Sequence, residues 1–221
     1  MRSFSNHCAG ASRDIDSSWI ATAIGALLLS VCAASAQGTI TVTFDGPPIQ
    51  PPGSQYLVQQ YYESGVWFLP IPGTDGFVRN GGGITGYPDD GTAYVQSIQG
   101  GSPMFGLVDG SSFDPVSVDM AEYSDVVRDP ETVHFVGYRA DGTVLTDDIT
   151  TAGSFNGVAP VFQTFTFSPA FSGLTRVQIS PVVPWSLDNL TLRRSVPEPA
   201  TGSLLGVAAL LLLGIRRLRR K

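Results

Sequence analysis

The 221-residue chain is poor in cysteine, histidine and charge. It has two cysteines and two histidines, and 14% of its residues are charged, against about 25% in average soluble domains. Two cysteines cannot form a disulfide framework, and two histidines cannot form a histidine-rich metal site. Glycine (25) and proline (16) are abundant but stay below the level of low-complexity disorder. The many Phe and Val residues between turns favour a packed core, within a length suited to one domain.

The N-terminal segment predicts a signal peptide. An apolar run extends from Trp19 to Val31, and Ala34 and Ala36 then form the A-x-A pattern of signal peptidase sites. We therefore expect residues 1–36 to be removed by cleavage after Ala36. A retained N-terminal anchor is the alternative, although the run is shorter than the roughly 20 apolar residues that span a bilayer comfortably.

The C-terminal segment predicts a short apolar helix with a basic end. Residues 201–215 are mostly apolar, and five of the final six residues, 216–221, are basic. A basic cluster after an apolar segment is held on the cytoplasmic side of a membrane. A proline-rich spacer before a short apolar tail is also the layout of a removable sorting tail. An ordinary single-span anchor is the alternative.

The motif Val196-Pro197-Glu198-Pro199, the apolar helix and the basic end together resemble the PEP-CTERM sorting domain of Gram-negative bacteria, a tail also labelled an ice-binding protein C-terminal domain. The resemblance covers residues 196–221. It implies that a membrane protease-transpeptidase, the exosortase, recognises Pro-Glu-Pro and cuts there or nearby. An inner-membrane intermediate would then give a protein at the cell surface or in the extracellular matrix, often in bacteria that make exopolysaccharide.

Between these ends, residues 37–195 form an acidic domain without cysteine or lysine. Six arginines and 16 acidic residues give it a formal charge of −10. Such a surface repels nucleic-acid phosphates and anionic lipid, which excludes nucleic acid and the membrane surface as partners of this domain. Divalent cations and neutral polymers suit it better.

The domain reads as β-structure nearly throughout, because short apolar or alternating segments recur between turn residues. The predicted strands are Thr39–Phe44, Val66–Ile71, Thr92–Ile98, Met104–Val108, Val116–Ala121, Thr132–Ala140, Thr143–Thr150, Pro160–Phe167, Leu174–Ser180 and Ser186–Leu192. Asp141-Gly142 predicts a two-residue type I′ hairpin turn. The pattern predicts an all-β fold, a single antiparallel β-sandwich of jelly-roll type.

Residue types that catalyse hydrolysis are scarce in this domain, and no catalytic residue is assigned. Its one histidine, His134, is predicted on the sheet face away from the main core, whereas a catalytic triad needs a histidine in a cleft with a carboxylate behind it. Asp147 and Asp148 are adjacent in a predicted strand and would point to opposite faces. Zinc sites need several His or Cys ligands, which this sequence does not supply.

A polysaccharide-active hydrolase is an alternative class of protein for this sequence. Such an enzyme brings two carboxyl groups to about 5–9.5 Å from each other across the bond that it cleaves. Asp89-Asp90-Gly91 is typical of a solvated turn, so acids in the loops around Asp75, Asp89 and Asp114 would have to converge in a groove. A purely structural surface protein without a ligand is another alternative.

Asp45 and Asp188 are candidate ligands of a structural calcium ion. Asp45 ends the first predicted strand, and Asp188 shares by parity the face of Leu190 and Leu192 in the last one. We therefore expect Asp188 to be partly buried and to need a partner. Calcium takes six to eight oxygen ligands, which loops of an acidic β-sandwich supply. Backbone amides that bond Asp188 are the alternative partner.

The segments 43–46 (Thr-Phe-Asp-Gly) and 187–190 (Leu-Asp-Asn-Leu) resemble parts of extracellular jelly-roll domains of the galactose-binding-like or carbohydrate-binding-module kind. In those domains the first and last strands are often neighbours, and residues there often hold structural calcium. The resemblance therefore implies a β-sandwich that binds carbohydrate and carries calcium near Asp45 and Asp188.

Aromatic residues could supply a platform on which sugar rings stack. Tyr61 and Tyr62 lie in a polar stretch, and one of the two should be exposed, so both are candidate glycan-binding residues. For Trp67 and Trp185, core packing is favoured over a platform. The leading hypothesis is a secreted, exosortase-processed surface or matrix protein, non-enzymatic and carbohydrate-binding, with signal peptidase and exosortase as processing partners.

Overall fold

The computed structural model describes residues 38–97, 101–127, 129–155, 157–180 and 182–195. The regular structure in these ranges consists of thirteen β-strands that pair antiparallel, which confirms the all-β prediction. No helix of the described residues is both long and apolar enough to cross a membrane. The predicted signal peptide and sorting tail lie outside the described residues.

All ten predicted strands have a counterpart in the structure, and three further strands are present. The strands are β1 (Thr39–Val42), β2 (Gln55–Val58), β3 (Tyr61–Glu63), β4 (Val66–Pro70), β5 (Phe77–Asn80), β6 (Tyr94–Gln96), β7 (Pro103–Leu107), β8 (Phe113–Glu122), β9 (Thr132–Arg139), β10 (Val144–Thr150), β11 (Gln163–Thr166), β12 (Leu174–Ile179) and β13 (Trp185–Arg194).

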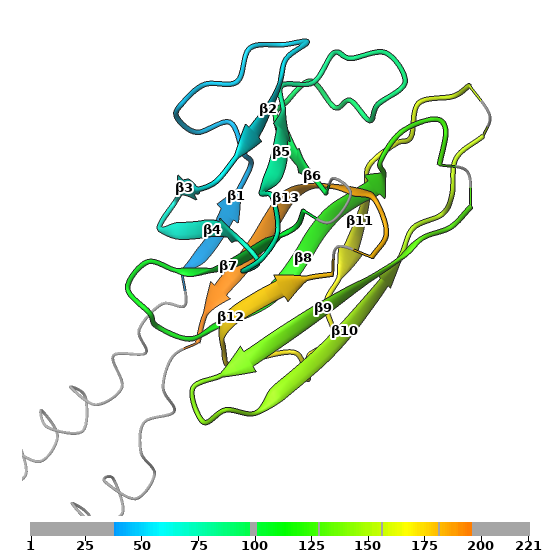
Figure 1. Cartoon of the computed structure of the whole chain (residues 1–221). Helices are drawn as coiled ribbons and strands as arrows, with labels where there is room; N and C mark the ends of the chain where they lie inside the picture. The colour runs from blue at the N-terminus through cyan, green and yellow to red at the C-terminus, as the bar shows by residue number, and fades with distance from the viewer. Residues whose placement is uncertain (1–37, 98–100, 128, 156, 181, 196–221) are drawn as a thin grey trace, which may run out of the picture. The chain divides into compact units, whose positions relative to one another are not determined.

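The strands form the two layers of a β-sandwich (Figure 1). In the first layer the order is β2-β5-β6-β13-β8-β11, and β1 pairs with the second half of β13. In the second layer the order is β3-β4-β7-β12-β9-β10. The layers are joined where Leu174 of β12 pairs with Phe113 of β8. First and last strands are thus neighbours, as the jelly-roll prediction requires.

The core between the layers is rich in phenylalanine, because inward positions of both layers carry large apolar side chains. Phe105 of β7 lies 5.9 Å from Phe113 of β8, measured between ring centroids. Phe135 of β9 lies 5.1 Å from Phe167, just after β11. All four of these rings are buried. Each fully buried ring contributes about 1.5–3 kcal/mol to folding by removal of apolar area from water.

The three strands missed by the sequence pattern are β2, β3 and β5. β2 and β3 are short and are separated only by Gln59 and Gln60, so neither shows a sustained alternation. In β5 the apolar pattern is interrupted by Arg79, which is buried even though it is charged. The Arg79 guanidinium donates to the carbonyl oxygens of Phe44 and Gly46. These tertiary bonds make burial of the charge possible, and no local pattern predicts them.

The hairpin between β9 and β10 forms at the predicted place with a different turn. Tyr138 pairs with Val144, which leaves a three-residue loop after Arg139, and the Gly142 N–H donates to the Arg139 carbonyl (3.1 Å). Of the loop residues only Gly142 has a positive φ (85°). A type I′ turn needs positive φ at both central residues, so the two-residue prediction was wrong and the loop is a type I turn followed by a left-handed glycine.

A β-bulge in β13 changes the face on which Asp188 lies. Asp188 pairs with Asp119 and Thr191 with Ser117, so β13 has one extra residue between these pairs. Asn189 adopts φ 47° there, a left-handed conformation that asparagine tolerates better than most residues. The extra residue reverses the alternation, so Asp188 lies opposite the core face that carries Leu190. The predicted shared face was therefore wrong, while the predicted burial of Asp188 is confirmed, since the residue is 0% exposed.

Candidate functional site

The outer face of the second layer carries a line of aromatic side chains. On β4 and β9 buried residues alternate with less buried ones over most of the strand, so the alternate positions point away from the core. These outward positions include Trp67 on β4 and Tyr138 on β9, and Tyr62 on β3 is 51% exposed. We call Tyr62, Trp67, Gly106, Arg176 and Tyr138 the aromatic row.

The strand register places the members of the aromatic row side by side. Tyr62 pairs with Trp67, and Trp67 pairs with Gly106 of β7. Val177 pairs with Phe105, which puts Arg176 of β12 beside Gly106. Arg176 pairs in turn with Tyr138. With the exposed Val144 of β10 at its far end, the line crosses six strands, or about 24 Å at the usual strand spacing of about 4.8 Å.

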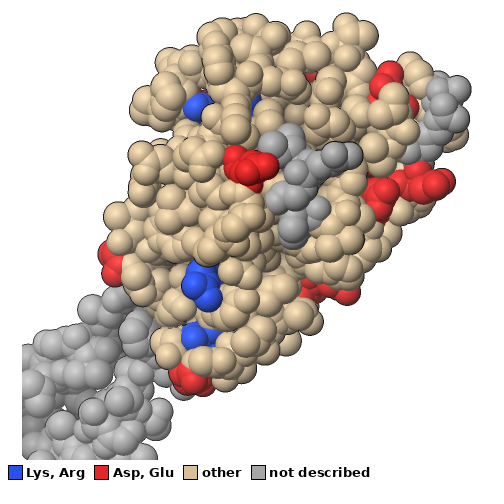
Figure 2. Space-filling view, viewed as in Figure 1, with Lys and Arg blue, Asp and Glu red and all other residues tan. Residues whose placement is uncertain are grey.

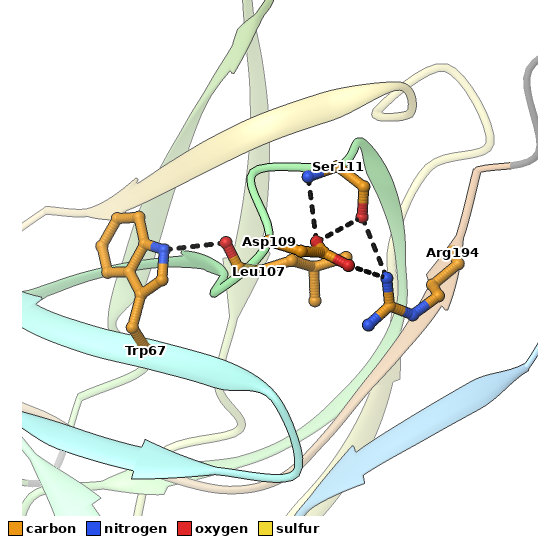
Figure 3. A network of polar contacts seen from close by, with 5 residues as sticks. All are labelled: Trp67, Leu107, Asp109, Ser111 and Arg194. Atoms are coloured by element: carbon orange, nitrogen blue, oxygen red, sulfur yellow. Dashed lines mark hydrogen bonds and ion pairs between the residues drawn. The ribbon is translucent and has the colours of Figure 1, made fainter.

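Gly106 provides the space in which the Trp67 indole lies. A Cβ at position 106 would come within 2.7 Å of Trp67 Cζ2 and 2.8 Å of the Thr175 carbonyl oxygen. The indole Nε1–H donates to the Leu107 carbonyl oxygen at 3.1 Å (Figure 3). The indole is thus held against the strand backbone, half-buried, with its orientation fixed.

Hydrogen bonds and an ion pair connect the turn after β7 to the last strand, β13. The Asp109 carboxylate accepts hydrogen bonds from the Ser111 N–H and hydroxyl and forms an ion pair with Arg194 (Figure 3). The hydroxyl of Ser111 and the guanidinium of Arg194 hold the pKa of Asp109 well below its usual range. This network ties the β7–β8 turn to the end of β13.

Arg176 and Tyr138 form a stacked pair in the aromatic row. The Arg176 guanidinium carbon lies 4.3 Å from the centroid of the Tyr138 ring, a cation–π distance. The Tyr138 hydroxyl donates to Gln178 Oε1 at 2.8 Å, so the ring is fixed from its other end. Arg176 Nε is shielded from solvent and has no hydrogen-bond acceptor among the described residues.

His134 and Asp148 lie on the same outer face, further along β9 and β10. His134 Nδ1 lies 2.7 Å from Asp148 Oδ1, and both side chains are about half exposed (51% and 56%). Asp147 points the other way and accepts a hydrogen bond from the Ser168 N–H. The predictions for these three residues are confirmed: His134 faces away from the core, and the adjacent aspartates point to opposite faces.

The outer face is almost uncharged in the view of Figure 2. Tan atoms dominate the view, and basic and acidic atoms occur only as small, separate groups. The outward positions of this layer include only three ionisable groups among the described residues other than tyrosine: Arg176, His134 and Asp148. The acidity of the domain is therefore concentrated elsewhere.

Tyr61 and Tyr62 divide as the alternation predicts, with one buried and one exposed. Tyr61 is 3% exposed, lies under the Arg79 guanidinium at 4.5 Å, and donates its hydroxyl to Glu63. It therefore belongs to the core and offers no platform.

Trp185 is buried as expected, whereas Trp67 lies on the outer face, so the core prediction for Trp67 was wrong. Sequence reasoning missed Gly106 and Arg176, although alternation along β9 already puts Tyr138 on the face of His134.

The two predicted calcium ligands contact adjacent residues of the segment before β6. Asp45 Oδ1 accepts a hydrogen bond from the Ala93 N–H (2.9 Å). Asp188 Oδ2 lies 3.0 Å from Thr92 Oγ1, and Asp90 Oδ1 lies 2.6 Å from the same hydroxyl. Among the described residues there is no group of three or more His, Cys, Asp or Glu arranged to hold a metal ion.

Asp188 is held in an environment that disfavours its charge. Burial raises its pKa to about 9, and a hydrogen bond with Asp90 adds to the effect, while the Asn189 N–H opposes it. The Asn189 N–H donates to Asp188 Oδ1 at 2.7 Å, so a backbone amide is one partner, as the alternative to calcium expects. The Thr92 hydroxyl has one hydrogen, so it can donate to only one of these two carboxyl groups at a time.

Asp89 and Asp125 line one cavity of about 380 Å³, together with Tyr87. The Tyr87 ring packs edge-on against Tyr123 at 5.3 Å. Of the other acids considered for hydrolysis, Asp114 is bonded to Arg193 and Ser195, and Asp75 is exposed in the loop before β5. A convergence of Asp75, Asp89 and Asp114 is therefore not formed.

No family model and no curated protein sequence matches the chain. Among solved structures, the chain is similar to the family 11 carbohydrate-binding module from Clostridium thermocellum in complex with a β-1,3-1,4-mixed-linked tetrasaccharide, at 12% identity and a TM-score of 0.31, over 74% of this chain and 100% of that one. It is also similar to the Clostridium thermocellum endo-1,4-β-D-xylanase 10B modules complexed with xylohexaose (14%, TM-score 0.31, 72% and 28%). A third match is the tailspike protein 4 enzymatically active domain of bacteriophage CBA120 (14%, TM-score 0.31, 71% and 21%). At these values the likenesses assign neither a family nor a function.

Proposed function

We propose that this chain is an exported, non-enzymatic bacterial surface or matrix protein whose β-sandwich binds polysaccharide on the outer face of its second layer. The observation that carries the proposal is the aromatic row, in which Tyr62, Trp67 and Tyr138 lie in one line across neighbouring strands. Ligand sites combine aromatic surfaces with a few fixed polar groups, and rings of this kind offer apolar faces to the C–H faces of sugars. A line across six strands suits an extended polymer.

Affinity electrophoresis of the exported protein, in gels that contain exopolysaccharide of its own host, tests this proposal. Trp67→Ala and Tyr62→Ala should each lower the affinity at least about tenfold, because burial of an aromatic ring is worth about 1.5–3 kcal/mol. Tyr56→Ala is the matched control, since Tyr56 is 55% exposed on β2 of the other layer. Equal migration of wild type and both variants in every gel would refute the proposal.

We also propose a structural calcium ion at the predicted ligands Asp45 and Asp188, with Asp90 as a further carboxylate beside Asp188. The donor set fits a divalent cation because two carboxyl groups approach one hydroxyl, and one of them is fully buried. Calcium bound there would take the place of the proton that the raised pKa of Asp188 implies. Phe44, immediately before Asp45, is held at φ 58°, which sets the direction in which the chain enters this region.

The thermal midpoint at pH 8 tests the calcium proposal. Addition of calcium to chelator-treated protein should raise the midpoint, by RT ln(1 + [Ca²⁺]/Kd) in stability, and Asp188→Asn should abolish the rise. Asp75→Asn, which removes an exposed acid elsewhere, should leave the rise intact. An unchanged midpoint when chelator is added to metal-loaded protein would exclude the ion.

For localisation we propose export through the signal peptide and processing of the tail at Pro197-Glu198-Pro199. β13 ends at Arg194, so a cut in this motif removes no strand of the sandwich. The intact mass of protein recovered from the cell surface should lack the residues after the cut. The Glu198→Ala variant should not be cut, so its mass should include these residues. A surface protein that keeps Lys221 would contradict processing and favour the single-span anchor.

A hydrolase is the second candidate function, and the cavity that Asp89 and Asp125 share is the observation in its favour. If this cavity is an active site, release of reducing ends from the host polysaccharide should require Asp125 and be lost in Asp125→Asn. If the protein only binds, no reducing ends appear with wild-type protein at concentrations that give full retention in gels.

A further inference from the structure

We infer that the polysaccharide bound on the aromatic row carries carboxylate groups, as uronic acids do, and that Arg176 binds them. The inference rests on the proposed function and deepens it by naming the class of polymer. It is based on the hydrogen-bond acceptors of the guanidinium groups: the other described arginines have acceptors within the chain, and Arg176 has none.

Every other arginine that the structure describes has acceptors for its guanidinium. Arg79 donates to backbone carbonyl groups, and Arg139 Nε donates to the Ser172 carbonyl oxygen at 2.8 Å. Arg193 and Arg194 form ion pairs with Asp114 and Asp109. Among the described arginines, Arg176 alone has a guanidinium group without a hydrogen bond or an ion pair, and its Nε is shielded from water. The Nη groups of Arg176 are not among the shielded donors, so they are open to an acceptor from outside the chain, which would pair with a cation that the described residues leave without one.

The Arg176 guanidinium is positioned for a ligand that lies on the outer face. Its stacking on Tyr138, 4.3 Å from the ring centroid, and the anchoring of that ring by Gln178 at 2.8 Å restrict where the group can move. Gly106 is beside Arg176 in the register, and the Trp67 indole lies over it, so an aromatic ring flanks the guanidinium on this side as well. A polymer that stacks on Trp67 and Tyr138 would therefore pass directly over the guanidinium.

Charge on this face favours a carboxylate over a neutral hydroxyl as the acceptor. The other two ionisable groups at outward positions, His134 and Asp148, are bonded to each other at 2.7 Å. Among the residues that the structure describes, Arg176 thus has no counterion on the ligand-facing surface. The planar guanidinium fork matches a carboxylate in a bidentate pair, and such charge-assisted bonds are about twice as strong as neutral ones.

The acidic character of the rest of the domain does not prevent this binding. Its formal charge of −10 repels a polyanion at long range. At physiological ionic strength this repulsion is screened beyond about 8 Å. The one acid at the outward strand positions of this layer, Asp148, is paired with His134, so the pairing at Arg176 is the nearest interaction for a chain that follows the aromatic row.

The test compares one polymer with and without its carboxylates: polygalacturonate, and the same preparation after chemical reduction of its carboxyl groups to alcohols. Wild-type protein should bind polygalacturonate about tenfold or more tightly than the reduced polymer. Arg176→Gln should remove this difference, so that the ratio of the two affinities falls to about one, whatever happens to the binding of the reduced polymer itself. Arg176→Lys should recover only part of it, because lysine lacks the planar fork. Arg193→Gln makes the same change of charge on β13 of the other layer and is the control.

Each outcome decides between the inference and the proposed function. Equal binding of both polymers by wild-type protein, sensitive to Trp67→Ala, would overturn the carboxylate inference and leave polysaccharide binding intact. Equal retention of dextran sulfate and polygalacturonate would also overturn it, because charge alone would then suffice. Loss of the preference in Arg193→Gln as much as in Arg176→Gln would remove the role of Arg176. Retention of neither polymer would refute the inference, and the host-polysaccharide gels would then decide the proposed function separately.

Discussion

Single residues determine whether the outer face can act as a platform. Gly106 leaves the space that the Trp67 indole occupies, and the Leu107 carbonyl oxygen fixes the indole nitrogen. Arg176 and Tyr138 continue the same line on the next two strands. None of these residues is unusual in type or spacing, so their importance follows from the register of strands that are distant in sequence.

Gly106→Ala should destabilise the domain by about 1–3 kcal/mol, because an added methyl group must displace either the indole or the Thr175 carbonyl group. Urea denaturation measures the loss. Gly38→Ala is the control, since no atom lies within 4 Å of a Cβ there, and a change within about 0.5 kcal/mol is expected. Equal stability of Gly106→Ala and wild type would mean that the indole does not lie on Gly106.

At the scale of elements, the bulge in β13 is the feature with the largest consequence. One extra residue at Asn189 lets Leu187 and Leu190 both face the core, and it turns Asp188 to the opposite side. Asn189 Nδ2 also donates to Asp119 Oδ2 at 2.9 Å, which holds the bulge against β8. A regular strand would have put Asp188 among the leucines.

Asn189→Val should therefore cost more stability than Asn189→Gly. Both variants lose the bond to Asp119, but glycine adopts φ 47° freely, while a β-branched residue is strained there by about 1–3 kcal/mol. The difference between the two urea midpoints, converted with a common m-value, measures the backbone contribution alone. Identical midpoints would show that the left-handed conformation at Asn189 is not required.

For the whole molecule, the titration of a few aspartates sets how stability changes with pH. Burial would raise the pKa of Asp114, but its bonds with Ser195, the Gly173 N–H and Arg193 together lower it. The pKa of Asp141 is lowered by the Thr143 N–H and hydroxyl. Their stabilisation is present above the unfolded pKa of 3.8 and is lost as pH falls through the lowered values. Asp188 acts in the opposite direction, because its pKa is raised to about 9.

In the presence of chelator, the free energy of unfolding should therefore be greatest in mildly acidic solution. As pH rises from about 4 toward 9, the unfolded state has lost the Asp188 proton while the folded state keeps it, so stability falls. Asp188→Asn should remove this alkaline fall and retain the fall below pH 4. Urea titrations across the pH range measure both limbs. An alkaline fall that persists in Asp188→Asn would assign it to another group.

Much of the fold could be predicted from the sequence, whereas the candidate site could be predicted only in part. Turn residues and alternation identified ten of thirteen strands, and the expectation that one of Tyr61 and Tyr62 is exposed is confirmed, while only the structure shows that it is Tyr62. β5 was missed because its buried Arg79 is satisfied by carbonyl groups 31 to 35 residues earlier in the chain. The prediction that Trp67 is in the core was wrong because residue type alone does not show which face of a sheet lies against a second layer.

The sequence by itself determined the acidic, thiol-free composition of the domain, its short strands and its all-β class, because these follow from residue type and a period of two. Tertiary structure decided which strands lie side by side, and with that the aromatic row, the reversal of Asp188 and the isolation of Arg176. Register between distant strands depends on the packing of the whole core and on bulges such as that at Asn189, where one residue changes the face of its neighbours. Local sequence does not carry that information, because each strand can alternate correctly in either register.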